Sequence, residues 1–166
     1  MRTENPSMSP AVESQDKHNM GLGMYGRLGA MTALSFVSMY ILMYAMADSI
    51  GDVFNSTNQV YMAGLMTAPM VILELLLMNS MYQDKTKNLI ILVVAAAALL
   101  AFFSAIRFQA AIGDNQFLRS MIPHHSGAIL MCREAKISDP QLKQLCSEII
   151  ESQRREIVQM KALLSR

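Results

Sequence analysis

The residues best suited to chemistry in this 166-residue chain gather in one short segment, 121–132, which reads MIPHHSGAILMC. The segment holds two of the three histidines, two methionines and one of the two cysteines. Thioether, thiolate and neutral imidazole are soft to borderline ligands that together favour Cu(I), whereas Mg²⁺ or Ca²⁺ needs several carboxylates. The segment therefore predicts a copper site. Zinc is the less favoured alternative, because the C-x-x-C and H-x-x-x-H spacings are both absent.

Two predicted helices position these residues as a hairpin. The first begins at Asp114, and the second follows the turn KISDPQ, with Ser138 or Asp139 as its cap and Pro140 at its first position. Pro123 lies inside the first helix, where it removes a backbone hydrogen bond and is expected to kink the chain just before the two histidines.

One face of each predicted helix carries the candidate ligands. At about 100° per residue, the first helix places its histidines and sulfur side chains within one arc, and the second helix has a matching stripe. We expect the two faces to converge on a single interior pocket. The candidate metal ligands are Met121, His124, His125, Met131, Cys132, Cys146, Glu156 and Met160.

Simpler roles compete with metal binding at several of these positions. A single methionine on a buried helix face is usually packing, whereas two adjacent histidines on such a face need partners, either a metal or a polar network. For Cys132 and Cys146 the alternatives are small apolar filler, a disulfide or thiolate ligation. We expect no enzyme, because no Ser-His-Asp set or glycine-rich phosphate loop is found in the sequence.

The rest of the chain predicts a membrane protein. The composition is 52% hydrophobic and 16% charged, and three apolar stretches, 28–47, 59–78 and 89–106, are long enough to cross a bilayer. The second stretch contains Pro69. The first span carries Met39, Met43 and Met46 on one face, and the second carries the transmembrane candidates Met62, Met66, Met70 and Glu74.

The positions of Lys and Arg predict the orientation of these spans. The segment before the first span and the loop after the second are basic, whereas the loop between the first two spans has aspartates and no Lys or Arg. This alternation predicts a cytoplasmic N-terminus and an external C-terminal hairpin; cleavage of the first span as a signal peptide is the competing interpretation. The predicted regions are a disordered cytoplasmic tail at 1–24, a three-helix membrane region at 25–107 and the external hairpin at 108–166. The net charge of +1 gives no argument for nucleic-acid binding.

The two hairpin segments FLRSMIPHHSGAILMCREAK and LKQLCSEIIESQRREIVQMKALL resemble the bacterial domain-of-unknown-function 305 family. The resemblance covers about residues 114–165 and implies a ferritin-like helical bundle, usually exported or membrane-anchored, with some members implicated in periplasmic copper binding and copper tolerance. The two cysteines depart from the family pattern. The positions that match its hallmarks are Met121, His124, His125, Met131, Gln153, Glu156 and Met160.

The expected fold is all-α: three transmembrane helices followed by an extramembrane hairpin, which forms a ferritin-like four-helix bundle as a homodimer or higher homo-oligomer because two helices cannot enclose a core alone. The leading hypothesis is a copper-binding protein of the bacterial inner membrane that captures Cu(I) at a periplasmic or extracellular hairpin. The alternatives are a copper transporter with a methionine-lined path, similar in outline to the Ctr copper transporters, and a structural oligomeric membrane protein without metal.

Overall fold

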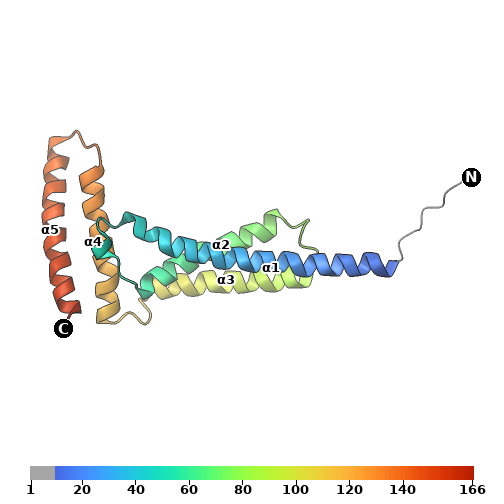
Figure 1. The fold of residues 1–166 in the computed structure, drawn as a ribbon. Helices are drawn as coiled ribbons and strands as arrows, with labels where there is room; N and C mark the ends of the chain where they lie inside the picture. Colours follow the sequence, from blue (N-terminus) through green and yellow to red (C-terminus); the bar gives the residue numbers. More distant parts are fainter. Residues whose placement is uncertain (1–9) are drawn as a thin grey trace, which may run out of the picture.

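The computed structural model describes the backbone of residues 10–166 and the side chains from residue 23 onward. Within this range the chain is all-α, with no strand, as predicted (Figure 1). Five long helices are joined by loops, the first of which contains two short 3-10 turns. The elements are α1 (Pro10–Leu42), η1 (Met43–Met46), η2 (Ile50–Asp52), α2 (Thr57–Leu77), α3 (Lys85–Arg107), α4 (Asp114–Glu134) and α5 (Pro140–Leu164).

Helices α1, α2 and α3 form an elongated bundle in which α2 packs against both of the others (Figure 1). The segments Gly23–Met46, Thr57–Leu77 and Lys85–Arg107 are long and apolar enough to cross a membrane, in agreement with the three predicted stretches. Only 6% of the first and third segments is buried inside the protein. So much exposed apolar surface is typical of helices that face lipid.

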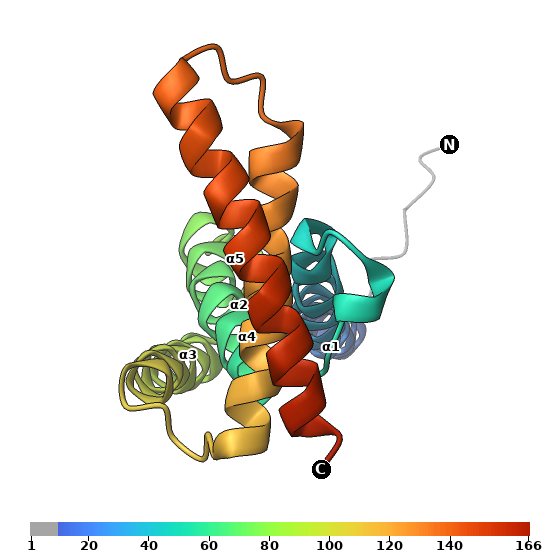
Figure 2. The same ribbon diagram turned by 90° about the vertical axis from the view of Figure 1, so that its left-hand side faces the viewer.

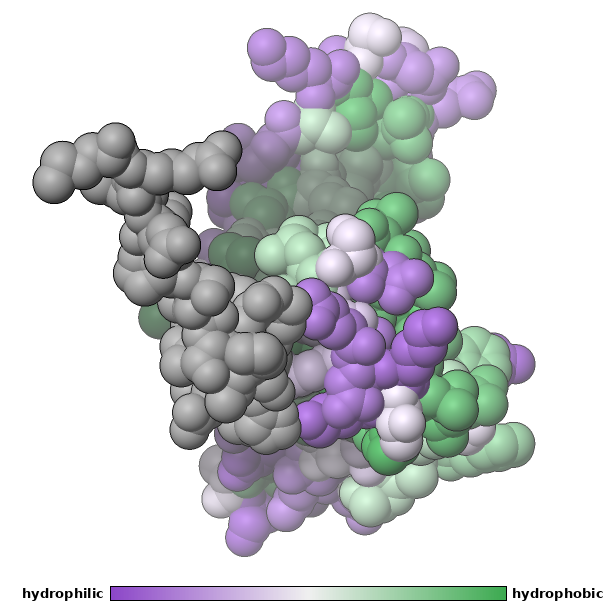
Figure 3. All heavy atoms as spheres, turned by 90° about the vertical axis from the view of Figure 1, so that its right-hand side faces the viewer, coloured by the Kyte–Doolittle hydropathy of each residue, from purple (hydrophilic) through white to green (hydrophobic). Residues whose placement is uncertain are grey.

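The described part of α1 overlaps the segment 1–24, which was predicted as a disordered cytoplasmic tail. Residues 1–9 lie outside the described part of the chain, but from Pro10 onward the backbone is helical and continues without a break into the first apolar segment. Proline at the first helical position is favourable because its missing N–H would have no partner there. Figure 3 looks at the bundle from the end opposite to the hairpin and shows hydrophilic residues gathered there; Asp84 lies directly before α3 at this end, and Lys85 and Lys87 lie in its first turn.

Short polar side chains define where several helices begin. Ser56 caps α2, Asp84 caps α3 and Asp139 caps α5, each accepting a hydrogen bond from a backbone N–H of the first helical turn. The prediction of Asp139 as a cap with Pro140 at the first position is therefore confirmed. Asp114 is the first residue of α4 rather than its cap, where its carboxylate still favours the positive end of the helix dipole.

Helices α4 and α5 form the predicted hairpin, which lies across one end of the bundle (Figures 1 and 2). Its core consists of Ile122, Ile129, Ile157 and Met160, which are at most 9% exposed. Helix α4 lies between α5 and the bundle, so it is covered on two sides. This double covering determines where the histidine segment points.

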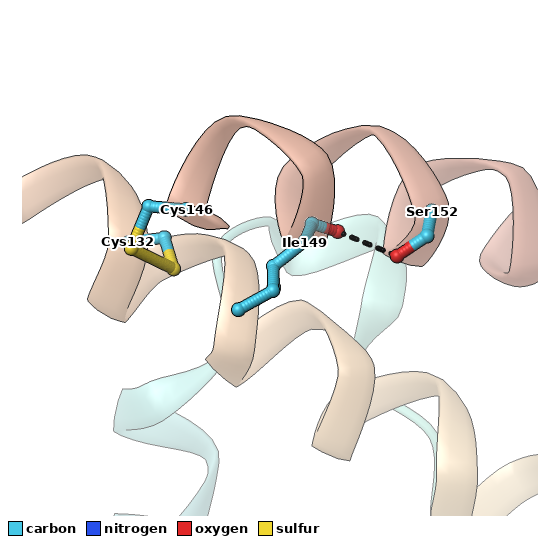
Figure 4. Close-up of a disulfide and its surroundings, with 4 residues drawn as sticks. All are labelled: Cys132, Cys146, Ile149 and Ser152. Carbon is cyan, nitrogen blue, oxygen red and sulfur yellow. Dashed lines mark hydrogen bonds between the residues drawn. A yellow bond between two sulfur atoms is a disulfide. The ribbon is translucent and has the colours of Figure 1, made fainter. Parts of the chain in front are cut away.

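A disulfide joins the two helices of the hairpin near their connecting turn (Figure 4). It links Cys132 on α4 to Cys146 on α5, whose Cα atoms are 5.2 Å apart. Of the three roles left open by the sequence, the structure therefore shows the disulfide. Neither sulfur is a free thiolate in this state.

Candidate metal site

A cavity of about 550 Å³ lies where α4 crosses the end of the membrane bundle. We call it the junction cavity. None of the residues that line it is charged, and Ser56, Asn58, Gln59 and Ser120 contribute neutral polar side chains. The soft metal donors are one imidazole and six thioethers. These donors are Met43, Met46, Met62, Met66, Met121, Met131 and His124.

Helix α4 supplies three of these donors, namely Met121, His124 and Met131. Their spacing of three and seven residues places them on one face of the helix, which is the face turned toward the bundle. Gly127 lies on the same face and lets α4 approach η1, because an added Cβ would be 3.3 Å from the carbonyl oxygen of Met46. A larger residue there would force the two walls of the cavity apart.

The membrane bundle supplies the other four thioethers. Met43 and Met46 come from η1, and Met62 and Met66 come from the first half of α2. Met62 and Met66 are 39% and 45% exposed, so their side chains have room to move. Met70 is one turn further along α2 and does not line the cavity.

His125 has different surroundings from His124, although the two ring centroids are only 6.1 Å apart. Its Nδ1 atom lies 3.0 Å from Oε2 of Glu156 on α5, in an orientation that does not form a hydrogen bond. Burial lowers the pKa of His125; Glu156 opposes this shift, and the neighbouring His124 adds to it. The imidazole of His125 is therefore held in its neutral form, beside α5 rather than in the junction cavity.

The structure thus does not bring the eight candidate ligands of the hairpin into one interior pocket. Consecutive residues on a helix are about 100° apart, and α4 packs against neighbours on two sides, so His124 and His125 face different neighbours. Met160 lies in the hairpin core, with Met121 packed against the same core cluster. Among the described residues, no group of three or more His, Cys, Asp or Glu side chains could hold a metal ion. A metal here would depend on methionine sulfur.

Glu74 lies away from the junction cavity. It accepts a hydrogen bond of 3.3 Å from the hydroxyl of Tyr82, in the α2–α3 connection at the other end of the bundle. A carboxylate near a helix end can satisfy its oxygen atoms without entering the apolar middle of a membrane. The sequence leaves two positions open for Glu74, beside the methionines at membrane depth or near the end of its helix, and the contact with Tyr82 favours the second.

A polar cluster fixes the hairpin to the α1–α2 loop. Ser126 Oγ donates to Asp52 Oδ2 at 2.7 Å and accepts from the backbone N–H of Asp48 at 2.8 Å. Lys161 on α5 donates to Asp52 Oδ1 at 2.6 Å, and Arg133 pairs with the carboxylate of Asp48. We call this set of residues the loop clamp. It holds α4 over η1 and so fixes the width of the junction cavity.

Sequence reasoning did not assign the loop clamp or the site role of Met43 and Met46. The methionines of the first span were visible as a stripe, but nothing local indicates that the helix ends in a 3-10 turn beneath α4. The two aspartates of the loop served only as evidence for orientation. The bonds of Asp52 to Ser126 and Lys161 join positions 74 and 109 residues apart.

Comparisons with known proteins identify the family of the chain. The sequence profile of a family described as "Domain of unknown function (DUF305)" matches residues 95–164. An uncharacterized protein of Acanthamoeba polyphaga mimivirus is 39% identical over 137 residues, which is 81% of this chain and 88% of the relative. An alignment of that length cannot fit within residues 95–166, so the similarity extends into the membrane helices. No solved structure matches the chain. The chain belongs to the DUF305 family.

Proposed function

We propose that this chain is a membrane-anchored, extracytoplasmic protein that captures Cu(I) for storage, buffering or handover. The observation that supports this most directly is that Met121, His124 and Met131 of the family segment line one cavity. Two thioethers and an imidazole, with no carboxylate beside them, match the preferences of Cu(I) and not those of Mg²⁺ or Ca²⁺. Copper is the bound cargo in this proposal, and no enzymatic step is involved.

The charges of the loops and the disulfide both favour an external hairpin. The segment from 48 to 58 has no Lys or Arg, whereas Lys85 and Lys87 lie in the first turn of α3, at the opposite end of the bundle. Disulfides persist in oxidising compartments, which suits a hairpin outside the cytosol. In a bacterium this arrangement places the N-terminus in the cytoplasm and the hairpin on the periplasmic side of the inner membrane.

Self-association is part of the same proposal. Helix α5 leaves Leu142, Leu145 and Leu163 45%, 49% and 42% exposed, on and beside the side of the helix that carries the hairpin core. A second hairpin packed on these side chains would complete a four-helix bundle. The expected result is a dimer or higher oligomer for the detergent-solubilised chain, measured by light scattering with correction for bound detergent.

Competition with a Cu(I)-selective chelator under anaerobic conditions tests the binding proposal on the purified full-length chain in micelles. The triple variant Met121→Leu/His124→Ala/Met131→Leu should bind Cu(I) about tenfold or more weakly than the original chain. Met81→Leu is the matched control, because Met81 is exposed and lies in the α2–α3 connection, away from the cavity. Equal Cu(I) affinities for the triple variant and the original chain would overturn the proposal.

Two other functions lead to different measurements. A copper transporter is favoured by Met62 and Met66, which line the same cavity from the membrane side. It requires Cu(I) flux into proteoliposomes that is lost in Met62→Leu/Met66→Leu. A structural oligomer without metal requires that the chain, purified without chelator and then offered Cu(I), binds none.

A further inference from the structure

Sulfur donors approach the junction cavity from two separate parts of the protein. The hairpin wall contributes Met121, Met131 and His124, and the membrane wall contributes Met43 and Met46 of η1 with Met62 and Met66 of α2. The two walls are held together by the loop clamp, through Asp52 and Ser126.

We propose that the junction cavity is a composite Cu(I) site, in which thioethers of the membrane helices complete the ligand set of the hairpin. This inference rests on the proposed function and goes beyond it, because it assigns metal ligands to η1 and α2. The hairpin donors alone are then an incomplete site. An ion that binds to the hairpin donors therefore also contacts the donors of η1 and α2.

The absence of charge among the residues that line the cavity selects the type of ion. The cost of removing an ion from water rises with the square of its charge, so a divalent ion pays about four times the penalty of a monovalent ion of the same size. With no carboxylate to offset that cost, neutral donors favour a soft monovalent ion. Cu(I) and its analogue Ag(I) are both soft and both monovalent.

The methionines also have the flexibility that such a site requires. A cavity of about 550 Å³ is larger than a single ion needs, so the donors must move inward around it. Methionine is unbranched and has three rotatable bonds, and the two α2 members are about two-fifths exposed. The thioethers of the two walls are therefore able to close on an ion without a change in the helices.

The α2 donors also indicate where an ion would go next. Met62, Met66 and Met70 are four residues apart, which on an α-helix is a rise of about 6 Å per step. The first two line the cavity, and the third lies on the same face beyond it. The composite site is the outer end of this row of sulfur atoms.

Methyl NMR of the full-length chain in micelles, labelled with [methyl-¹³C]methionine, tests the assignment directly with Ag(I) as the probe. On addition of one equivalent of Ag(I), the methyl resonances of both walls should shift, whereas those of Met24 and Met31 should stay in place, because these two pack on the core of the membrane bundle. Shifts confined to Met121 and Met131 would overturn the composite site while leaving the proposed function intact. The absence of any shift would overturn both.

Substitution gives a second, independent test by chelator competition and X-ray absorption with Cu(I). One variant replaces the four methionines of the membrane wall with leucine, and a control variant replaces four methionines elsewhere in the chain. The membrane-wall variant should bind Cu(I) about tenfold or more weakly, with fewer sulfur neighbours around the ion. The control variant should have the same Cu(I) affinity and sulfur count as the original chain. Unchanged affinity and sulfur count in the membrane-wall variant, with binding lost in the hairpin triple variant, would overturn this inference alone. If the membrane-wall variant does not fold, the double variant Met62→Leu/Met66→Leu replaces it, and its Cu(I) affinity and sulfur count should also fall. The membrane-wall variant is Met43→Leu/Met46→Leu/Met62→Leu/Met66→Leu, and the control is Met24→Leu/Met31→Leu/Met78→Leu/Met81→Leu.

Discussion

Replacing Ser126 with alanine should open the loop clamp while leaving both helices of the hairpin formed. Ser126 is fully buried, and its hydroxyl makes two hydrogen bonds, of 2.7 Å to Asp52 and 2.8 Å from the N–H of Asp48. The substitution leaves a buried donor and a buried acceptor without this partner, at about 1–3 kcal/mol for each unpaired group. Because Asp52 keeps its bond to Lys161, the main loss is the partner of the Asp48 N–H, and we expect a total of about 2 kcal/mol, the middle of the range for one group.

Hydrogen exchange measures this change in the full-length chain in micelles. A cost of about 2 kcal/mol on local opening corresponds to exchange about 30-fold faster in the loop of residues 47–55. Ser152→Ala is the matched control, because its hydroxyl donates only to the carbonyl of Ile149 in the same helix, at 3.0 Å (Figure 4). Loop exchange within about twofold of the original rate in Ser126→Ala, or an equal acceleration in Ser152→Ala, would refute the reasoning.

Three further predictions concern stability. Replacing both Cys132 and Cys146 with serine removes a crosslink between positions 14 residues apart and should destabilise the hairpin by about 3 kcal/mol in denaturant titrations, without changing the amount of Cu(I) bound. Gly64→Ala places a Cβ 2.5 Å from the ring of Phe102, so the melting temperature should fall by an amount corresponding to about 1–3 kcal/mol, and adding Phe102→Leu should restore part of it. The pKa of His125 is lowered in the folded chain, so the unfolded chain binds more protons between that pKa and 6.5. Melting temperatures should therefore fall as the pH is lowered from neutral through 6.5 and level off below the folded pKa, and His125→Gln should flatten this dependence.

The membrane spans and the hairpin were predictable because local sequence determines them. A run of about twenty apolar residues needs no tertiary information to be recognised as long enough for a bilayer. The start of α5 is equally local, since Asp139 caps it and Pro140 fits only its first turn. The apolar segments of the first three helices and the two hairpin helices therefore match the predicted segments closely, although α1 itself begins at Pro10.

The arrangement of the candidate site was not predictable in the same way. Helical periodicity shows which residues share a face, but not how many sides of a helix are covered. The sequence analysis assumed that α4 has one buried face. Under that assumption, the helical spacing of about 100° per residue predicted that both histidines face the same pocket. The contacts that correct this are long-range: the loop clamp reaches Ser126 and Lys161 from Asp52, and η1 turns Met46 under α4. None of these contacts has a signal in the neighbouring sequence.

The two covered sides of α4 give the adjacent histidines separate roles. His124 faces the junction cavity, where neutral thioethers surround it, and His125 lies beside Glu156 on α5. A step of one residue turns a side chain by about 100°, so two consecutive histidines suit a helix that must present an imidazole to each of two neighbours. Burial lowers the pKa of His125 at the hairpin interface, while His124 lines the cavity. In the proposed composite site the first histidine is the metal donor, whereas the second packs between α4 and α5 beside Glu156.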